Sequence, residues 1–163
     1  MAKNKQEWNF HSKTKKRRTI PSNKETAYKK SLKEWVMFWR ENPHRFAQDY
    51  LGIRLRWFQE MIIYEFDKNT NSVFIGTRGV GKSFLTAVFA CCMAILYPNS
   101  NIVIVCATKS QAMELINTKI EKELCGMSVM LRKEIKEFKS PQEEKIVFFK
   151  NGSTILATNA SAN

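Results

Sequence analysis

The segment from Gly76 to Ser83 has the residue types and the spacing of a phosphate-binding loop. It reads GTRGVGKS and fits the pattern GxxxxGK[ST], in which glycines let successive backbone N–H groups point at phosphate oxygens. We expect Lys82 to contact the terminal phosphates and the Ser83 hydroxyl to coordinate Mg²⁺. The segment therefore predicts a nucleoside triphosphate site with Mg²⁺, formed by Gly76, Thr77, Arg78, Gly79, Val80, Gly81, Lys82, Ser83 and Phe84.

Arg78 adds a second cation to this loop. A guanidinium at this place could lie against the γ-phosphate and neutralise charge during phosphoryl transfer, as an arginine finger does. The alternative is an arginine that points outward into solvent from an exposed loop. The sequence favours Arg78 and Lys82 as the catalytic residues and leaves the direction of Arg78 open.

Gln59 is a candidate for recognition of the base. Its amide both donates and accepts hydrogen bonds, so it can pair with N6 and N7 of adenine, and Trp57 or Phe58 can stack on the ring. The other interpretation is an ordinary polar position on an amphipathic helix. Because the residue precedes a phosphate-binding loop, we keep ATP as the expected nucleotide.

The elements around the loop follow the pattern of an α/β fold. Residues 72–75 form a short apolar run, 82–96 an apolar helix, and 101–107, NIVIVCA, a run rich in β-branched residues that is typical of a strand buried on both faces. Strand, crossover helix and strand predict a βαβ unit in a parallel sheet.

The rest of the chain continues this pattern. Residues 110–124 have apolar positions on one helical face, and two strands follow at 145–149 and 153–158, joined by Asn151-Gly152, a strong hairpin signal. Upstream, helical periodicity predicts helices over 24–40, 45–51 and 57–66. We expect three regions: a basic arm at 1–23, a helical lead-in at 24–71, and a P-loop core at 72–163.

Composition limits the class of protein. The chain has 163 residues and a formal net charge of +12, concentrated in its first fifth, which favours a polyanionic partner or a solvated basic tail. The four cysteines and two histidines show no zinc-ligand spacing, so we expect reduced structural thiols. The longest apolar run, 84–97, is shorter than the roughly 20 residues that span a bilayer, so we expect no membrane segment.

Four blocks of the sequence, in order, resemble the ATPase domain of the large terminase subunit, the viral DNA-packaging motor. They are ENPHRFAQDYLGIRLRWFQEMII, the loop with Arg78 four residues before Lys82, IVIVCATKSQAMELI, and KIVFFKNGSTILATNASAN. The resemblance covers roughly residues 41–163 and implies a RecA-like P-loop fold. It also implies ATP hydrolysis with Mg²⁺, coupled to translocation of double-stranded DNA, with Gln59 on adenine and Arg78 as a finger in cis.

The same resemblance implies partners and a location. The family works as a ring of identical subunits with a portal protein and a small terminase subunit, in the host cytoplasm and without a membrane. The family pattern continues into an apolar strand that ends in an aspartate and is followed by a glutamate, and residues 83–163 do not provide it. We therefore expect an incomplete core that binds nucleotide without efficient hydrolysis.

Two other classes of protein stay open at this point. One is a superfamily 2 helicase or another RecA-like ATPase, which shares an upstream glutamine and a P-loop. The other is a non-enzymatic module for DNA binding or assembly, in which the P-loop fold serves only as a scaffold.

Overall fold

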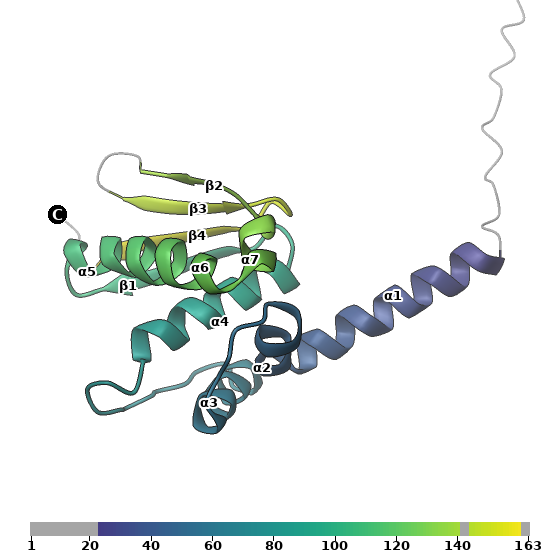
Figure 1. Ribbon diagram of the computed structural model, residues 1–163, viewed down its shortest axis with the longest axis horizontal. Helices are drawn as coiled ribbons and strands as arrows, with labels where there is room; N and C mark the ends of the chain where they lie inside the picture. Colours follow the sequence, from purple (N-terminus) through teal and green to yellow (C-terminus); the bar gives the residue numbers. More distant parts are fainter. Residues whose placement is uncertain (1–22, 141–143, 161–163) are drawn as a thin grey trace, which may run out of the picture.

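The computed structural model describes residues 23–140 and 144–160. It is an α/β structure in which one four-stranded sheet packs against helices, while helix α1 (Asn23–Glu41) projects away from the main body (Figure 1). Residues 1–22, most of the expected basic arm, lie outside the described residues.

The sheet is mixed, and the expectation of a parallel sheet is correct for one pair of strands only. Its strands are β1 (Asn101–Cys106), β2 (Ile135–Lys139), β3 (Lys145–Phe149) and β4 (Thr154–Asn159), in the order β1-β4-β3-β2. β1 pairs with β4 in parallel, whereas β3 is antiparallel to both β4 and β2. The antiparallel pairs arise because short connections join β2, β3 and β4, and short connections reverse the chain.

The β3–β4 hairpin is confirmed. Gly152 in its turn has a φ of 87°, a left-handed conformation that glycine adopts without the steric cost of a Cβ atom. The turn also anchors helix α4 (Lys82–Leu96), because Asn151 Nδ2 donates to Ala94 O at 2.8 Å and to Ile95 O at 3.1 Å. Carbonyls in the last turn of a helix have no partner within the helix, so this side chain supplies the missing donor.

The expected strand at residues 72–75 is absent, and this prediction was wrong. The segment has no regular structure, and Val73 and Ile75 are 91% and 90% exposed. An extended segment becomes a strand only when a neighbour satisfies its backbone N–H and C=O groups. Within the described residues β1 pairs only with β4, so no strand lies beside residues 72–75 and the expected βαβ unit does not form.

Strand β1 lies at an edge of the sheet, which corrects the expectation of burial on both faces. Ile104 is 9% exposed, but Val103 and Val105 are 56% and 60% exposed. Alternate side chains of a strand point to opposite faces, so helices cover the face that carries Ile104 and leave the face of the two valines open.

The expected helices are present. The N-terminal helices are α1, α2 (Pro43–Arg45), the π-helical segment η1 (Phe46–Tyr50) and α3 (Trp57–Lys68), and α4 has the predicted bounds. The helix expected at 110–124 begins as α5 (Lys109–Glu114), continues as the π-helix η2 (Leu115–Leu124) and ends in α6 (Cys125–Met127). Helix α7 (Val129–Glu134) and strand β2 were not predicted.

The core lies between α4, η2 and the sheet. It contains Cys91 and Cys92 of α4, both fully buried, with Ile116 and Ile120 of η2 and Ile155 of β4. All four cysteines are free, and burial raises the pKa of the Cys91 and Cys92 thiols, which agrees with the expected structural thiols. Within the described part of the chain, no helix is both long and apolar enough to cross a membrane.

Candidate phosphate-binding site

The loop before α4 has the backbone conformation that its glycines make possible. Gly79 and Gly81 have φ values of 93° and 90°, in the left-handed region that side chains with a Cβ atom rarely adopt. Gly81 is the N-cap residue of α4, and no side chain caps this helix terminus. The first N–H groups of α4 therefore have neither an intrahelical acceptor nor a capping oxygen, which is the arrangement that favours an anion.

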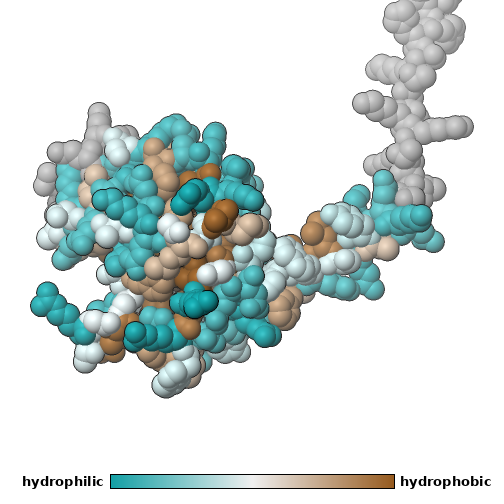
Figure 2. Space-filling model, viewed as in Figure 1, coloured by the Kyte–Doolittle hydropathy of each residue, from teal (hydrophilic) through white to brown (hydrophobic). Residues whose placement is uncertain are grey.

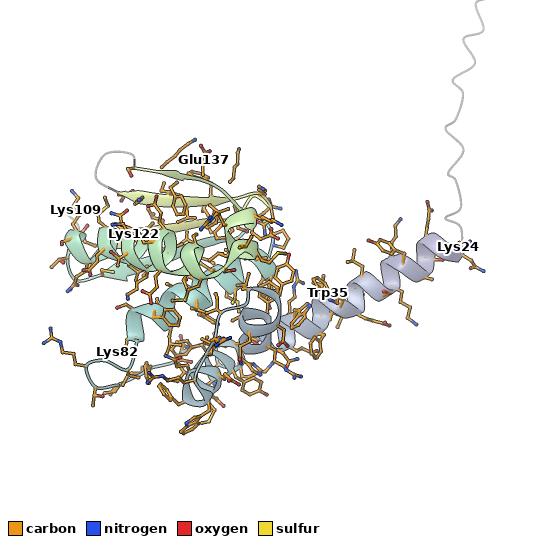
Figure 3. The ribbon with its side chains drawn as sticks, viewed as in Figure 1. Lys24, Trp35, Lys82, Lys109, Lys122 and Glu137 are labelled. Carbon is orange, nitrogen blue, oxygen red and sulfur yellow. The ribbon has the colours of Figure 1, made fainter. Side chains whose placement is uncertain are left out.

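Lys82 points back into the loop. Its Nζ donates to Gly76 O at 2.7 Å and to Thr77 O at 3.0 Å, and Figure 3 shows the residue where the loop meets α4. These two bonds use two of the three donors of the ammonium group, so a third donor is left for a ligand oxygen. They also hold the two ends of the loop together, because they join the first residue of α4 to the first residues of the loop.

Gln59 of α3 lies against the loop. A Cβ atom added to Gly81 would be 3.3 Å from Gln59 Nε2, while Gln59 Oε1 accepts a hydrogen bond of 3.0 Å from Arg56 N. The second interaction is half of a capping box at the start of α3. The structure thus brings the predicted base-recognition residue next to the loop and gives it a second, structural contact that the sequence analysis missed.

Trp57 and Phe58 line a separate apolar groove on the same helix. It has a volume of about 520 Å³ and is closed on its other side by the segment that includes Val73 and Phe74. Trp57 is 74% exposed, and its ring meets that of Phe58 edge to face at 5.9 Å. The two aromatic rings therefore present apolar surface beside the segment that precedes the loop, whereas Gln59 lies near Gly81.

Arg78 and Ser83 line one cavity of about 530 Å³. The opposite wall comes from the end of β1 and from α5 and η2, through Cys106, Gln111, Glu114, Leu115 and Lys119. This lining places the two residues on the same cavity, although Arg78 remains exposed. Lys82 is not part of the lining, because it is turned toward Gly76 and Thr77.

Gln111 and Glu114 were not predicted as site residues. The only signal for them was the segment ATKSQAMELI, which resembles the family but which we gave no chemical role. The Thr108 side chain caps α5 by accepting from Gln111 N at 3.3 Å, and this cap fixes the start of the helix that carries both residues.

No group of three or more histidine, cysteine or carboxylate side chains that could hold a metal occurs in the part of the chain that the structure describes. This is compatible with Mg²⁺ bound through a single hydroxyl, because Mg²⁺ at nucleotide sites keeps several waters and takes phosphate oxygens as ligands. Ser83 remains the predicted metal ligand.

Comparison with known proteins identifies the family. Residues 73–163, more than half of the chain, match the model of the family described as "Terminase large subunit, T4likevirus-type, N-terminal". No curated relative matches the chain. The match includes the loop, the cavity and the whole sheet, and it begins after Gln59, Trp57 and Phe58. It favours the terminase interpretation over the helicase, and the chain belongs to the terminase large-subunit family, in the region that the T4-like type has at its N-terminus.

Proposed function

We propose that this chain binds ATP with Mg²⁺ and forms the nucleotide-binding part of a motor that packages double-stranded DNA into a viral capsid. One observation carries the proposal. In a terminase chain, a GxxxxGK[ST] loop precedes the uncapped N-terminus of α4, and its Arg78 and Ser83 line a single cavity.

The residues present fit a nucleotide with its metal. Lys82 would donate its remaining N–H to a phosphate oxygen, the first N–H groups of α4 would donate to the same phosphates, and the Ser83 hydroxyl would hold Mg²⁺. The bound Mg²⁺ supplies positive charge that offsets the charge of the phosphates. Arg78 would add a mobile cation from the loop, and an arginine in this role raises the rate of hydrolysis by about 10³ to 10⁵ where it has been assigned.

Slow hydrolysis is the expected behaviour of the described residues alone. In the ATPases that this chain resembles, a carboxylate that follows an apolar strand activates the attacking water. The four strands end at Cys106, Lys139, Phe149 and Asn159, so none of the strands in the described ranges ends in aspartate or glutamate. Glu114 lies in the cavity but on a helix. We therefore infer nucleotide binding with little turnover.

The partners follow from the family. We propose that the chain acts on double-stranded DNA in a ring of identical subunits, together with a portal protein and a small terminase subunit, in the host cytoplasm. The net charge of +12 supports a polyanionic partner.

Binding of a fluorescent ATP analogue tests the proposal. The analogue is titrated with and without Mg²⁺ into the wild-type chain, into Lys82→Ala and into Lys122→Ala, a control that removes an exposed lysine of η2. We expect Lys82→Ala to weaken binding by about 10- to 100-fold, because it removes a charge-assisted hydrogen bond. Lys122→Ala should bind like the wild type.

The same samples give two further measurements. Displacement by ATP but not by GTP would support adenine recognition, and little phosphate release would support binding without turnover. Equal binding by Lys82→Ala and the wild type, or no binding in the presence of Mg²⁺, would contradict the proposal and favour a non-enzymatic module.

A further inference from the structure

Helix α1 carries an apolar groove where it meets the main body. The groove has a volume of about 650 Å³, and its floor is formed by Leu32, Val36 and Met37 of α1 and by Tyr97, which follows α4. Leu32 and Met37 are 46% and 48% exposed, and no residue of α1 is buried. Figure 2 shows hydrophobic surface on this projecting helix as well as on the body.

The groove is held in shape by contacts at the base of α1. Arg40 Nε donates to Leu96 O at 2.9 Å, and its guanidinium lies 4.6 Å from the centre of the Tyr97 ring. The Trp39 ring packs edge to face on the buried Phe46, with centres 5.8 Å apart. These contacts fix the last turn of α1 against the end of α4 and against η1, so this end of the groove is formed before any partner arrives.

The rim of the groove is basic. Lys29, Lys33 and Arg40 surround the apolar floor, and Glu41 is the one carboxylate among the lining residues. Lys29 and Lys33 are four residues apart on one helix face, a like-charged pair that destabilises an isolated helix. The nearby Lys30, in contrast, has an opposite charge beside it, with its Nζ 4.0 Å from Glu34 Oε1. An anionic partner over the groove would remove the repulsion between Lys29 and Lys33.

We propose that this groove binds an acidic amphipathic helix of another protein. The helix would place apolar side chains on Leu32, Val36, Met37 and Tyr97, and its carboxylates would meet Lys29, Lys33 and Arg40. DNA fits less well, because a phosphate backbone offers no apolar side chains to cover the floor. The same groove of a second copy also fits less well, because Lys29, Lys33 and Arg40 of one copy would face the same basic side chains of the other.

This interaction surface is separate from the phosphate-binding loop. Figure 3 shows Trp35 on the projecting helix and Lys82 at the loop, in different parts of the molecule. The proposal therefore does not depend on nucleotide binding and is tested without it.

The test uses a synthetic helical peptide of about four turns, with leucine and tryptophan on one face and glutamate on the other. Its affinity is measured for the wild-type chain, for Lys29→Gln with Lys33→Gln, and for Met37→Gln. The matched control is Lys122→Gln with Lys133→Gln, which removes the same charge from exposed positions of η2 and α7. A scrambled peptide of the same composition and a short duplex DNA serve as other ligands. Circular dichroism checks that each variant keeps its helix content.

We expect the amphipathic peptide to bind the wild type and the control variant equally and the scrambled peptide to bind neither. Loss of Lys29 and Lys33 should weaken peptide binding by about tenfold and reduce its salt dependence. Met37→Gln should weaken binding severalfold with the salt dependence unchanged.

Three results would overturn the proposal. One is the absence of peptide binding, or equal binding by the scrambled peptide. Another is equal loss in the Lys29/Lys33 variant and in the control, which would indicate non-specific charge attraction. The last is evidence that the groove binds something else. DNA is the occupant if the Lys29/Lys33 variant loses affinity for DNA but not for the peptide. A second copy of the chain is the occupant if the wild type self-associates and Met37→Gln abolishes that association.

Discussion

Gln59 combines a structural contact with a proposed contact to the base. Its Oε1 accepts from Arg56 N, which completes the first turn of α3, and its Nε2 faces Gly81 in the loop. Because an amide oxygen has two lone pairs, Oε1 can accept a second hydrogen bond from adenine while it keeps the cap. Replacing Gln59 by alanine would remove both contacts, so a loss of binding in that variant could not be assigned to either one.

Gln59→Glu separates the two roles. Glutamate at this position keeps an acceptor for Arg56 N and is itself a preferred capping-box residue, but it has no N–H to donate to N7 of adenine. We expect the free energy of unfolding to stay within about 0.5 kcal/mol of the wild type. The preference for ATP over GTP should fall by about tenfold. Chemical denaturation and competition binding measure the two quantities.

Gln59→Ala is the companion variant, and it should lose about 1 kcal/mol of stability with the cap. An unchanged preference for ATP in Gln59→Glu would assign the residue to the cap alone. Base recognition would then have to come from other groups, such as the apolar groove of Trp57 and Phe58.

Strand β1 differs on its two faces, and this difference decides which substitutions it tolerates. Ile104 lies on the covered face, whereas Val105 is 60% exposed on the open face. We expect Ile104→Ala to lower the free energy of unfolding by about 2 to 4 kcal/mol, because it leaves a cavity in the core. Val105→Ala should cost less than about 1 kcal/mol. Equal losses in thermal or chemical unfolding would show that the valine face is covered in solution.

The elements that the sequence predicted well are those specified by nearby residues. Helix α4 follows from a long apolar segment bounded by Gly81 and Pro98, and the hairpin follows from Asn151-Gly152. The prediction of a strand at residues 72–75 was wrong and strand β2 was missed, because pairing with a neighbouring strand decides whether a segment becomes a strand. The apolar segment 72–75 has no neighbouring strand, whereas the largely polar IKEFK of β2 pairs with β3.

At the scale of the whole molecule, the sequence suggested the loop side of the candidate site but not the wall on its other side. The loop residues could be proposed from the sequence because a fixed spacing of glycines with Lys82 and Ser83 has a direct chemical meaning, and their role stays a prediction. The wall formed by Gln111 and Glu114 depends on how α5 packs beside the end of β1, and no local pattern encodes that placement. Its geometry had to come from the structure.

The net charge of the whole molecule is unevenly distributed along the chain. Seven basic residues and one acidic residue precede residue 23, so neutralising the seven lowers the formal net charge from +12 to +5. If the basic arm is what contacts DNA, most of the salt dependence of DNA binding belongs to it, because each neutralised phosphate contributes about 0.9 to the slope of log K against log salt.

A variant of the full chain tests this, with glutamine at Lys3, Lys5, Lys13, Lys15, Lys16, Arg17 and Arg18. The affinity for duplex DNA is measured from low to physiological salt. We expect the slope of log K against log salt to become shallower by several units and the melting temperature to stay unchanged. The control carries glutamine at four exposed lysines of the body, Lys122, Lys133, Lys136 and Lys150, and should lose less slope for each charge removed. If the control loses more slope for each charge removed than the arm variant does, the DNA-binding surface lies on the helices and strands around the sheet, because their lysines then neutralise the phosphates.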